Sequence, residues 1–467
     1  MALKIYDTLR REKTEFVPVK PGEVGVYVCG MTVQGPPHVG HARAALSGDV
    51  IRRFLEFSGF RVRYVTNFTD VDDKIIERAN EEGVTYREIA ERNIEAYYRV
   101  SDALHIRRAD HYPRATEHIA EIIGMIERLV AGGYAYAAGG DVYYRVERFN
   151  GYGKLSGRRL EEMRAGARIE PGEAKENPLD FTLWKGAKPG EPSWPSPWGN
   201  GSPGWHIECS AMSMKYLGET FDLHGGGSDL IFPHHENEIA QSEATTGKPF
   251  VDFWVHNGLV NLTGEKMSKS TQHFFLAEEV LREFDPETVR YYLLSTHYRS
   301  PIEFNRERLA EAGAALRRLK TALEAAERAR ASSGPAERVE ADPSRRARAS
   351  FREAMEDDFN SARALGHLFD LARDLNKAAD EGAPTGEILD MAATLRELAA
   401  ILGVLWEDKA QEAGFPEEVT RLAAAREDAR KQRNWKLADD LRNQLLAAGV
   451  LVEDRPEGPV LRWKPKE

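Results

Sequence analysis

The stretch that decides the fold is Val24-Gly25-Val26-Tyr27-Val28-Cys29, a short and almost continuously apolar run. Such a run is typical of a strand that is buried on both faces. A Gly/Pro-rich turn follows at 30–37, and residues 42–58 carry the apolar periodicity of a helix. A second strand is predicted at 62–66. This order of strand, turn, helix and strand predicts an α/β fold with a Rossmann-like, doubly wound parallel sheet.

The composition and periodicity of the sequence change several times beyond this core. Helical periodicity prevails over 86–131, and Gly, Pro and Trp then accumulate up to about residue 203. We interpret that stretch as an insertion between two halves of the sheet. The predicted parts are the first half of the sheet domain (1–131), an insertion (132–203), the second half (204–262), a loop with helices from 274 (263–330), a linker with a helical bundle (331–416) and a helix pair with short strands (417–467).

The composition of the 467 residues excludes several classes of protein. Charged residues make up 30% and hydrophobic residues 42% of the chain, as is typical of a globular protein. No apolar run approaches the roughly 20 residues of a membrane span, and the first seven residues lack the apolar core of a signal peptide, so we expect a cytoplasmic protein. Two cysteines are too few for a secreted disulfide framework. The net charge of −11, taken alone, argues against nucleic-acid binding, so basic patches must be sought locally.

Two short motifs point to chemistry on a nucleotide. His38-Val39-Gly40-His41 stands where the first strand gives way to a helix, and Lys266-Met267-Ser268-Lys269-Ser270 follows much later. Activation of a carboxylate by ATP, with Mg²⁺, builds negative charge on the α-phosphate and on the departing pyrophosphate. Preorganised cations and N–H donors must meet that charge. Two imidazoles three residues apart lie on one face of a first helical turn, where backbone N–H groups also attract phosphate.

The remaining residues of both motifs suit the same chemistry. Gly40 removes a side chain where the nucleotide comes close. The pentapeptide 266–270, introduced by Gly264, can cover the triphosphate with two lysines. The two histidines alone would also suit a surface turn. Both motifs together, in this order, resemble the signature of class I aminoacyl-tRNA synthetases.

Possible metal ligands lie at separate places in the chain. His234 and Glu238 stand four residues apart, so both side chains point the same way on a helix. Cys29 ends the first strand, and sheet topology can bring it beside Cys209. Thiolate, imidazole and carboxylate are all zinc ligands. Burial of both cysteines in the core, or a purely structural zinc ion, would suit the same residues.

Several stretches together resemble the cysteinyl-tRNA synthetase family, over nearly the whole chain. They are Cys29-Gly30, the segments 67–74, 204–210 and 224–241, and Asp357-Asp358-Phe359-Asn360. The resemblance implies one zinc ion per chain in the amino-acid pocket, held by Cys29, Cys209, His234 and Glu238. It also implies a cysteine site lined by Thr69, Trp205 and His224, and a ribose contact through Asp229.

Zinc suits such a pocket because cysteine and serine differ by one atom, which a cavity of fixed size discriminates poorly. Zinc favours a soft thiolate and lowers the pKa of a thiol enough to bind it directly. Trp205 would also suit a packing role, and Thr69 a helix cap. The stretch Met31-Thr32-Val33-Gln34-Gly35 departs from the family's usual sequence and changes the rim of the nucleotide pocket.

The final segment carries a basic excess that the whole chain lacks. Residues 421–467 contain eleven basic and eight acidic residues, with Trp435 and Trp463 among them. An exposed aromatic ring can stack on an unpaired base. A solvated helix face with two packed tryptophans would suit the same residues. The segment 417–467 resembles the family's anticodon-binding domain, which implies tRNA(Cys) as a partner.

The resemblance implies a monomeric cysteine–tRNA ligase that forms cysteinyl-adenylate from L-cysteine and ATP and transfers the cysteine to tRNA(Cys). Its parts would be a Rossmann-like catalytic domain with an insertion, an α-helical bundle and a small anticodon-binding domain. One alternative is a ligase of the mycothiol pathway type, which passes cysteine to an amino sugar and usually lacks the C-terminal module. Another is a non-enzymatic RNA-binding paralogue, which should have lost phosphate or metal groups that are present here.

Overall fold

The computed structural model describes residues 2–164, 174–262, 276–332, 339–406, 417–432, 434–455 and 458–463. Its centre is a four-stranded parallel sheet with the order β10-β9-β3-β4. The strands are β3 (Glu23–Val28), β4 (Arg61–Thr66), β9 (Phe221–Gly227) and β10 (Val251–Asn257). The predicted parallel α/β sheet and its first two strands are therefore confirmed.

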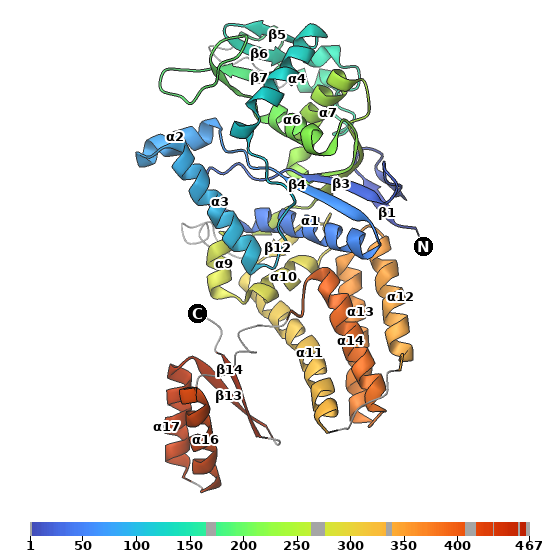
Figure 1. The fold of residues 1–467 in the computed structure, drawn as a ribbon, viewed down its shortest axis with the longest axis vertical. Helices are drawn as coiled ribbons and strands as arrows, with labels where there is room; N and C mark the ends of the chain where they lie inside the picture. The colour runs from blue at the N-terminus through green and yellow to red at the C-terminus, as the bar shows by residue number, and fades with distance from the viewer. Residues whose placement is uncertain are drawn as a thin grey trace.

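The helices around the sheet are α1 (Val39–Phe57), α2 (Asp73–Glu82), α3 (Tyr86–Ala103), α4 (Ile119–Ala131), α6 (Trp205–Leu217) and α7 (His234–Thr246). Val26 and Val28 belong to the core that includes α1, whereas Tyr27 belongs to the core that includes α6 and α7. Figure 1 shows α1 on one side of the sheet and α6 and α7 on the other. Because side chains alternate along a strand, the apolar run of β3 supplies both cores of a doubly wound domain.

The strand order reverses at β3, since β4 lies on one side of it and β9 on the other. Open α/β sheets bind ligands at such a point, outside the carboxyl ends of the strands. Cys29 lies at this end and donates its N–H to the carbonyl of Gly225, at 2.9 Å. A hairpin that the sequence did not reveal, β1 (Lys4–Asp7) with β2 (Glu12–Glu15), lies beside β10.

The chain between β4 and β9 builds a second sheet at the far end of the molecule (Figure 1). This sheet is antiparallel and consists of β5 (Ala135–Ala138), β6 (Asp141–Tyr144), β7 (Phe181–Gly186) and β8 (Gly201–Pro203). Trp184 and Tyr144 are fully buried in its core. The sequence composition did not indicate these strands, because runs of three to six residues are too short to show a clear alternation of apolar and polar residues. The domain boundaries derived from the sequence stay predictions.

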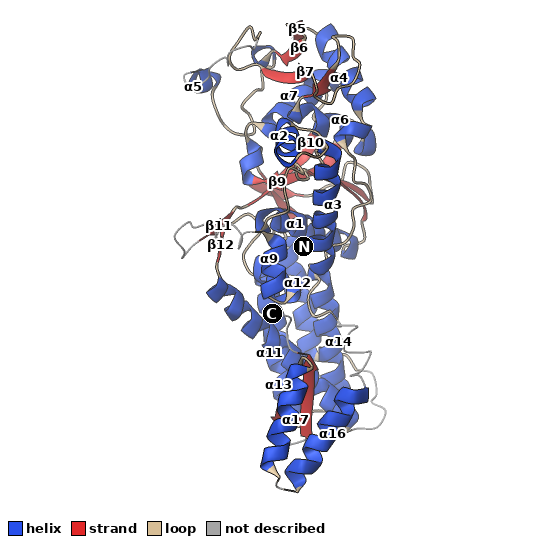
Figure 2. Cartoon of the chain, turned by 90° about the vertical axis from the view of Figure 1, so that its left-hand side faces the viewer, coloured by secondary structure: helices blue, strands red, loops and turns tan. Residues whose placement is uncertain are grey.

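The second half of the chain is mainly helical (Figure 2). Its elements are α9 (Ala277–Glu283), α10 (Pro286–Leu294), α11 (Arg306–Ala331), α12 (Asp342–Glu356), α13 (Ser361–Asp380) and α14 (Thr385–Leu402). One difference from the predicted helices over 274–330 is β12 (Ile302–Phe304), which pairs in parallel with β11 (Val260–Leu262). Within the described residues, no helix combines the length and apolarity that a membrane span requires.

The C-terminal part has the predicted helix pair and short strands. They are α16 (Glu417–Lys431), α17 (Trp435–Ala447), β13 (Val450–Arg455) and β14 (Gly458–Trp463), and the two strands pair antiparallel. Leu445 and Val450 are fully buried between helices and strands, so this part has a core of its own. Trp435 is 59% exposed at the first position of α17.

Candidate active site

Four side chains from separate elements meet at the carboxyl end of β3. Cys29 follows β3, Cys209 lies on α6, and His234 and Glu238 lie on α7. The Sγ atom of Cys29 is 3.7 Å from that of Cys209, and 3.5 Å from both His234 Nε2 and Glu238 Oε1. His234 Nε2 is 3.0 Å from Glu238 Oε1. All four residues are buried, so the structure brings together the ligand set that the family resemblance implied.

The separations within this ligand set suit a tetrahedral metal ion. Zinc–sulfur bonds of about 2.3 Å and zinc–nitrogen or zinc–oxygen bonds of about 2.0 Å place neighbouring ligand atoms about 3.3–3.8 Å apart. Of the four separations given above, three fall in this range, and the distance of 3.0 Å between His234 and Glu238 is slightly shorter. The donor set of two thiols, an imidazole and a carboxylate is consistent with a zinc site.

The electrostatics of the ligand set also favour a cation. Burial alone would raise the pKa of the Glu238 carboxyl, but His224 and His234 beside it hold that pKa at about 2. The hydrogen bond from the Cys29 thiol lowers the pKa of Cys209 to about 6, whereas burial raises the pKa of Cys29 well above its ordinary value. The Cys209 thiol thus loses its proton readily, whereas the Cys29 thiol keeps its proton until a positive charge approaches.

Further histidines surround the ligand set, and sequence reasoning missed them. The Nδ1 atom of His234 lies 2.9 Å from Nδ1 of His206, a contact that orients the His234 ring toward the cysteines. His235 Nδ1 is 2.7 Å from His256 Nε2, and His256 Nδ1 is 2.8 Å from the Thr8 hydroxyl. The only local signal was that His206 and His235 adjoin residues already singled out, because their partners come from distant segments.

The three residues expected in a cysteine pocket lie around the same ligand set. His224 Nε2 is 2.9 Å from Glu238 Oε2. The Trp205 ring lies 4.5 Å from that of His234 between centroids and is 38% exposed, so it lies between His234 and solvent. The Thr69 hydroxyl donates to Glu208 Oε2 at 2.9 Å, and Glu208 is a buried residue that the sequence did not single out. The alternative role of Thr69 as a helix cap is wrong for α2, whose cap is Asp72.

His38 and His41 cap the first turn of α1 reciprocally. The backbone N–H of each residue donates to Nδ1 of the other, at 3.2 and 3.3 Å, and the rings stack with centroids 3.6 Å apart. Burial lowers the pKa of both imidazoles, and that of His41 falls to about 3 with a further contribution from His38. Both rings are therefore neutral at pH 7, and because Nδ1 accepts, the ring proton belongs to Nε2.

Gly40 between the two histidines has a structural reason beyond the one expected from the sequence. A Cβ atom at position 40 would lie 2.9 Å from Cε1 of the His38 ring. Glycine is therefore needed to let the two imidazoles stack, whether or not a nucleotide also comes close.

Asp229 lies in a short turn, Ser228–Ile231, directly after β9. It is close enough to His38 for its charge to oppose the lowering of that imidazole's pKa. Asp229, the residue that we expect to contact the ribose, is thus near His38 of the first motif. The second motif, residues 266–270, lies outside the described residues. On its near side β11 ends at Leu262, and on its far side Leu276 pairs with His38 in an isolated β-bridge.

Known proteins share both the sequence and the fold of this chain. The family described as "tRNA synthetases class I (C) catalytic domain" matches residues 15–314, the "DALR domain" matches 350–406 and the "Cysteinyl-tRNA ligase anticodon binding domain" matches 412–460. The cysteine–tRNA ligases of Geobacter metallireducens and Geobacter sulfurreducens are 51% and 52% identical to it, with 100% of both chains covered. A Mycobacterium tuberculosis methionyl-tRNA synthetase in complex with methionyl-adenylate shares the fold, with a TM-score of 0.58 over 81% of this chain and 90% of its own, at 16% identity.

The three family matches follow one another along the chain in the order of a catalytic domain, a helical domain and an anticodon-binding domain. The two Geobacter relatives match this chain from end to end at about half of all positions. The chain therefore belongs to the cysteine–tRNA ligase family of class I aminoacyl-tRNA synthetases.

Proposed function

We propose that the chain activates L-cysteine with ATP and transfers the cysteine to the 3′ end of tRNA(Cys). The observation that carries the proposal is that the thiol-rich ligand set lies at the carboxyl end of β3, and that the chain leaving this end leads directly to His38 and His41 at the start of α1. An amino-acid site and an ATP site must adjoin for a carboxylate to attack the α-phosphate. Family membership supports the same reaction, with ATP as substrate and Mg²⁺ as its counterion.

One zinc ion, held by Cys29, Cys209, His234 and Glu238, would complete the amino-acid pocket. When bound, zinc would take the thiolate of cysteine as a further ligand, and the hydroxyl of serine is a far weaker one. The Thr69 hydroxyl gives its proton to Glu208 and so offers its lone pairs to the ammonium group of the substrate. The half-exposed Trp205 ring would cover the side chain of the bound amino acid.

On the ATP side, the two motifs would contribute different interactions. The neutral imidazoles of His38 and His41 would donate from Nε2 to phosphate oxygens, together with the N–H groups at the start of α1. Lys266 and Lys269 would supply the positive charge that meets the departing pyrophosphate, with Met267, Ser268 and Ser270 contacting the nucleotide. Gly40 would let the nucleotide approach α1, and Asp229 would accept hydrogen bonds from the ribose.

The C-terminal part would bind the anticodon end of tRNA(Cys). Trp435 is 59% exposed and can stack on an unpaired base, which supports this role. The amino-sugar ligase alternative is not favoured, because residues 412–460 match a cysteinyl-tRNA ligase anticodon-binding domain. A monomeric state and a cytoplasmic location stay predictions.

Two assays on one preparation test this function. ATP–pyrophosphate exchange should depend on cysteine, and the activated cysteine should then appear on tRNA(Cys). Glucosaminyl-inositol, offered as acceptor in place of tRNA, should receive none. Exchange without cysteine dependence, or transfer to the amino sugar and not to tRNA, would contradict the proposal.

A further inference from the structure

Arg43 lies two residues after His41 on α1, and it is 1% exposed. Its guanidinium donates to backbone carbonyls of two distant segments. Nη1 bonds to the carbonyl of Gly258 at 2.9 Å and of Leu259 at 3.0 Å. Nη2 bonds to the carbonyl of Ser300 at 2.5 Å and, at 3.4 Å, to that of His297. These carbonyls belong to the corner between β10 and β11 and to the turn before β12.

A buried guanidinium held only by carbonyl groups is costly to maintain. In the part of the chain that the structure describes, no carboxylate forms an ion pair with Arg43. Burial of a charge without a counter-ion lowers stability relative to an apolar side chain of similar volume. Stability therefore does not explain the arginine at this position. Its role must lie in the segments that the guanidinium holds in place.

Arg43 holds the strand that leads to the second motif. From the corner at Gly258, β11 runs to Leu262, and the lysine motif begins four residues later. Beyond that motif, the N–H of Ala277 donates to the carbonyl of Pro37 at 2.9 Å. The chain is thus tied to the start of α1 on both sides of residues 263–275.

We propose that Arg43 is a positioning residue for adenylate formation: it fixes β11, the strand that leads to the second motif, relative to His38 and His41. The inference rests on the proposed function. Phosphoryl chemistry is sensitive to sub-ångström displacement of its donors. The cysteine site is built from α6, β9 and α7 and from residues that follow β3 and β4, and none of its residues lies on β11, so its affinity should not depend on where β11 lies.

Gly258 offers an independent way to displace the same strand. A Cβ atom at this position would lie 2.4 Å from the carbonyl carbon and oxygen of Ser300. The N–H of Gly258 also donates to the carbonyl of Tyr298, at 2.8 Å. Gly258→Ala should therefore move the corner away from the turn before β12 while the Arg43 side chain stays intact.

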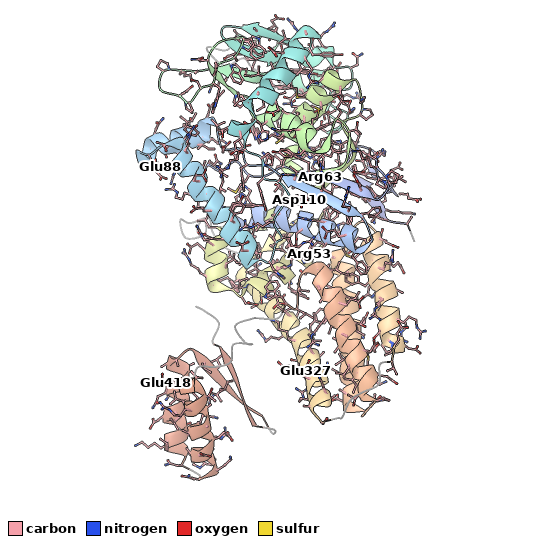
Figure 3. The ribbon with its side chains drawn as sticks, in the orientation of Figure 1. Arg53, Arg63, Glu88, Asp110, Glu327 and Glu418 are labelled. Carbon is pink, nitrogen blue, oxygen red and sulfur yellow. The ribbon has the colours of Figure 1, made fainter. Side chains whose placement is uncertain are left out.

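The test compares Arg43→Met, Arg43→Lys and Gly258→Ala with a matched control, Arg53→Met. Arg53 also lies on α1 (Figure 3) and donates to the carbonyls of His105 at 2.9 Å and Ala400 at 3.4 Å and to the Asp49 carboxylate at 2.8 Å, and none of these groups belongs to β11. Cysteine-dependent ATP–pyrophosphate exchange gives kcat and the KM for cysteine, and thermal denaturation gives the stability of each variant.

Arg43→Met and Gly258→Ala should lower kcat by roughly 10–100-fold and leave the KM for cysteine within about twofold. Arg43→Lys should recover part of kcat, and Arg53→Met should lose stability without loss of kcat. If Arg43→Met and Gly258→Ala both keep kcat within about twofold of the wild type, Arg43 does not position the reacting groups. The same conclusion follows if both variants raise the KM for cysteine as much as they lower kcat. If Arg43→Met does not fold, Gly258→Ala decides by the same criteria. Absence of cysteine-dependent exchange in the unaltered protein would instead contradict the proposed function.

Discussion

The Sγ atoms of Cys29 and Cys209 lie 3.7 Å apart, although 180 positions separate the two residues in the sequence. They are the only two cysteines of the chain, and both are buried and free of disulfide bonds. The parallel pairing of β3 with β9 places the end of β3 beside α6 and α7, which supply the other ligands. A shared cation would account for two thiols, an imidazole and a carboxylate in one buried space, because their few hydrogen bonds replace only part of the hydration that burial removes.

The first prediction concerns metal content. Protein purified without chelators should contain about one zinc ion per chain by elemental analysis, and Cys209→Ala should lose it, because a site with three remaining ligands binds far more weakly. Ser213→Ala, at another buried position of α6, is the matched control and should keep the metal. Metal-free wild-type protein, or equal metal in both variants, would count against the zinc site.

The second prediction concerns pH and the His41 imidazole. Its pKa is about 3 in the folded protein, against about 6.5 in an unfolded chain. Between these values only the unfolded chain binds the extra proton, so this contribution to stability is complete above about pH 6.5 and falls as the pH decreases toward 3. The unfolding free energy of the wild type should therefore fall more steeply than that of His41→Asn, by an amount approaching about 1.4 kcal/mol per pH unit. Urea denaturation at pH 7, 6 and 5 measures the difference, and parallel curves would show that His41 is not held neutral.

The third prediction concerns Lys269 of the second motif. Lys269→Ala should lower the rate of adenylate formation by roughly 10²–10³, the usual effect of removing one donor that acts in the transition state. The KM for cysteine should change little, since the proposed zinc ligands are untouched. Single-turnover formation of cysteinyl-adenylate measures this step directly. An unchanged rate would remove Lys269 from the mechanism.

The fourth prediction concerns the exposed ring of Trp435. Trp435→Ala should raise the KM for tRNA(Cys) roughly tenfold, because stacking on one base contributes about 1–3 kcal/mol. Leu446→Ala, on the same helix and 44% exposed, is the matched control. Charging assays over a range of tRNA concentrations measure both variants, and pyrophosphate exchange should be unaffected in each. Equal KM values for the two variants would mean that Trp435 does not contact the RNA.

Sequence alone predicts those features whose cause is local. The strand β3 was predictable because burial on both faces requires a continuous apolar run. His234 and Glu238 were predictable as neighbours because four residues make about one helical turn. The strand β12 was not, because its three residues become a strand only through pairing with β11, about 40 residues earlier in the chain.

Contacts that join distant segments could not be predicted from the sequence for the same reason. His206 meets His234 across 28 positions, Thr69 meets Glu208 across 139 and Arg43 meets Ser300 across 257. No periodicity links such pairs, because the sheet topology alone brings them together. The structural reason for glycine at position 40 was not predictable either. It arises from the stacking of His38 on His41, which depends on side-chain rotamers that the spacing of residues does not reveal.

A thiol-binding metal site would select cysteine over serine. The most direct measurement is kcat/KM for ATP–pyrophosphate exchange with cysteine and with serine on the same zinc-containing preparation. We expect cysteine to be favoured by about 10³-fold or more, because a pocket that relied on size alone would distinguish one atom by only about 10–200-fold. Activation of serine within about tenfold of cysteine would contradict it.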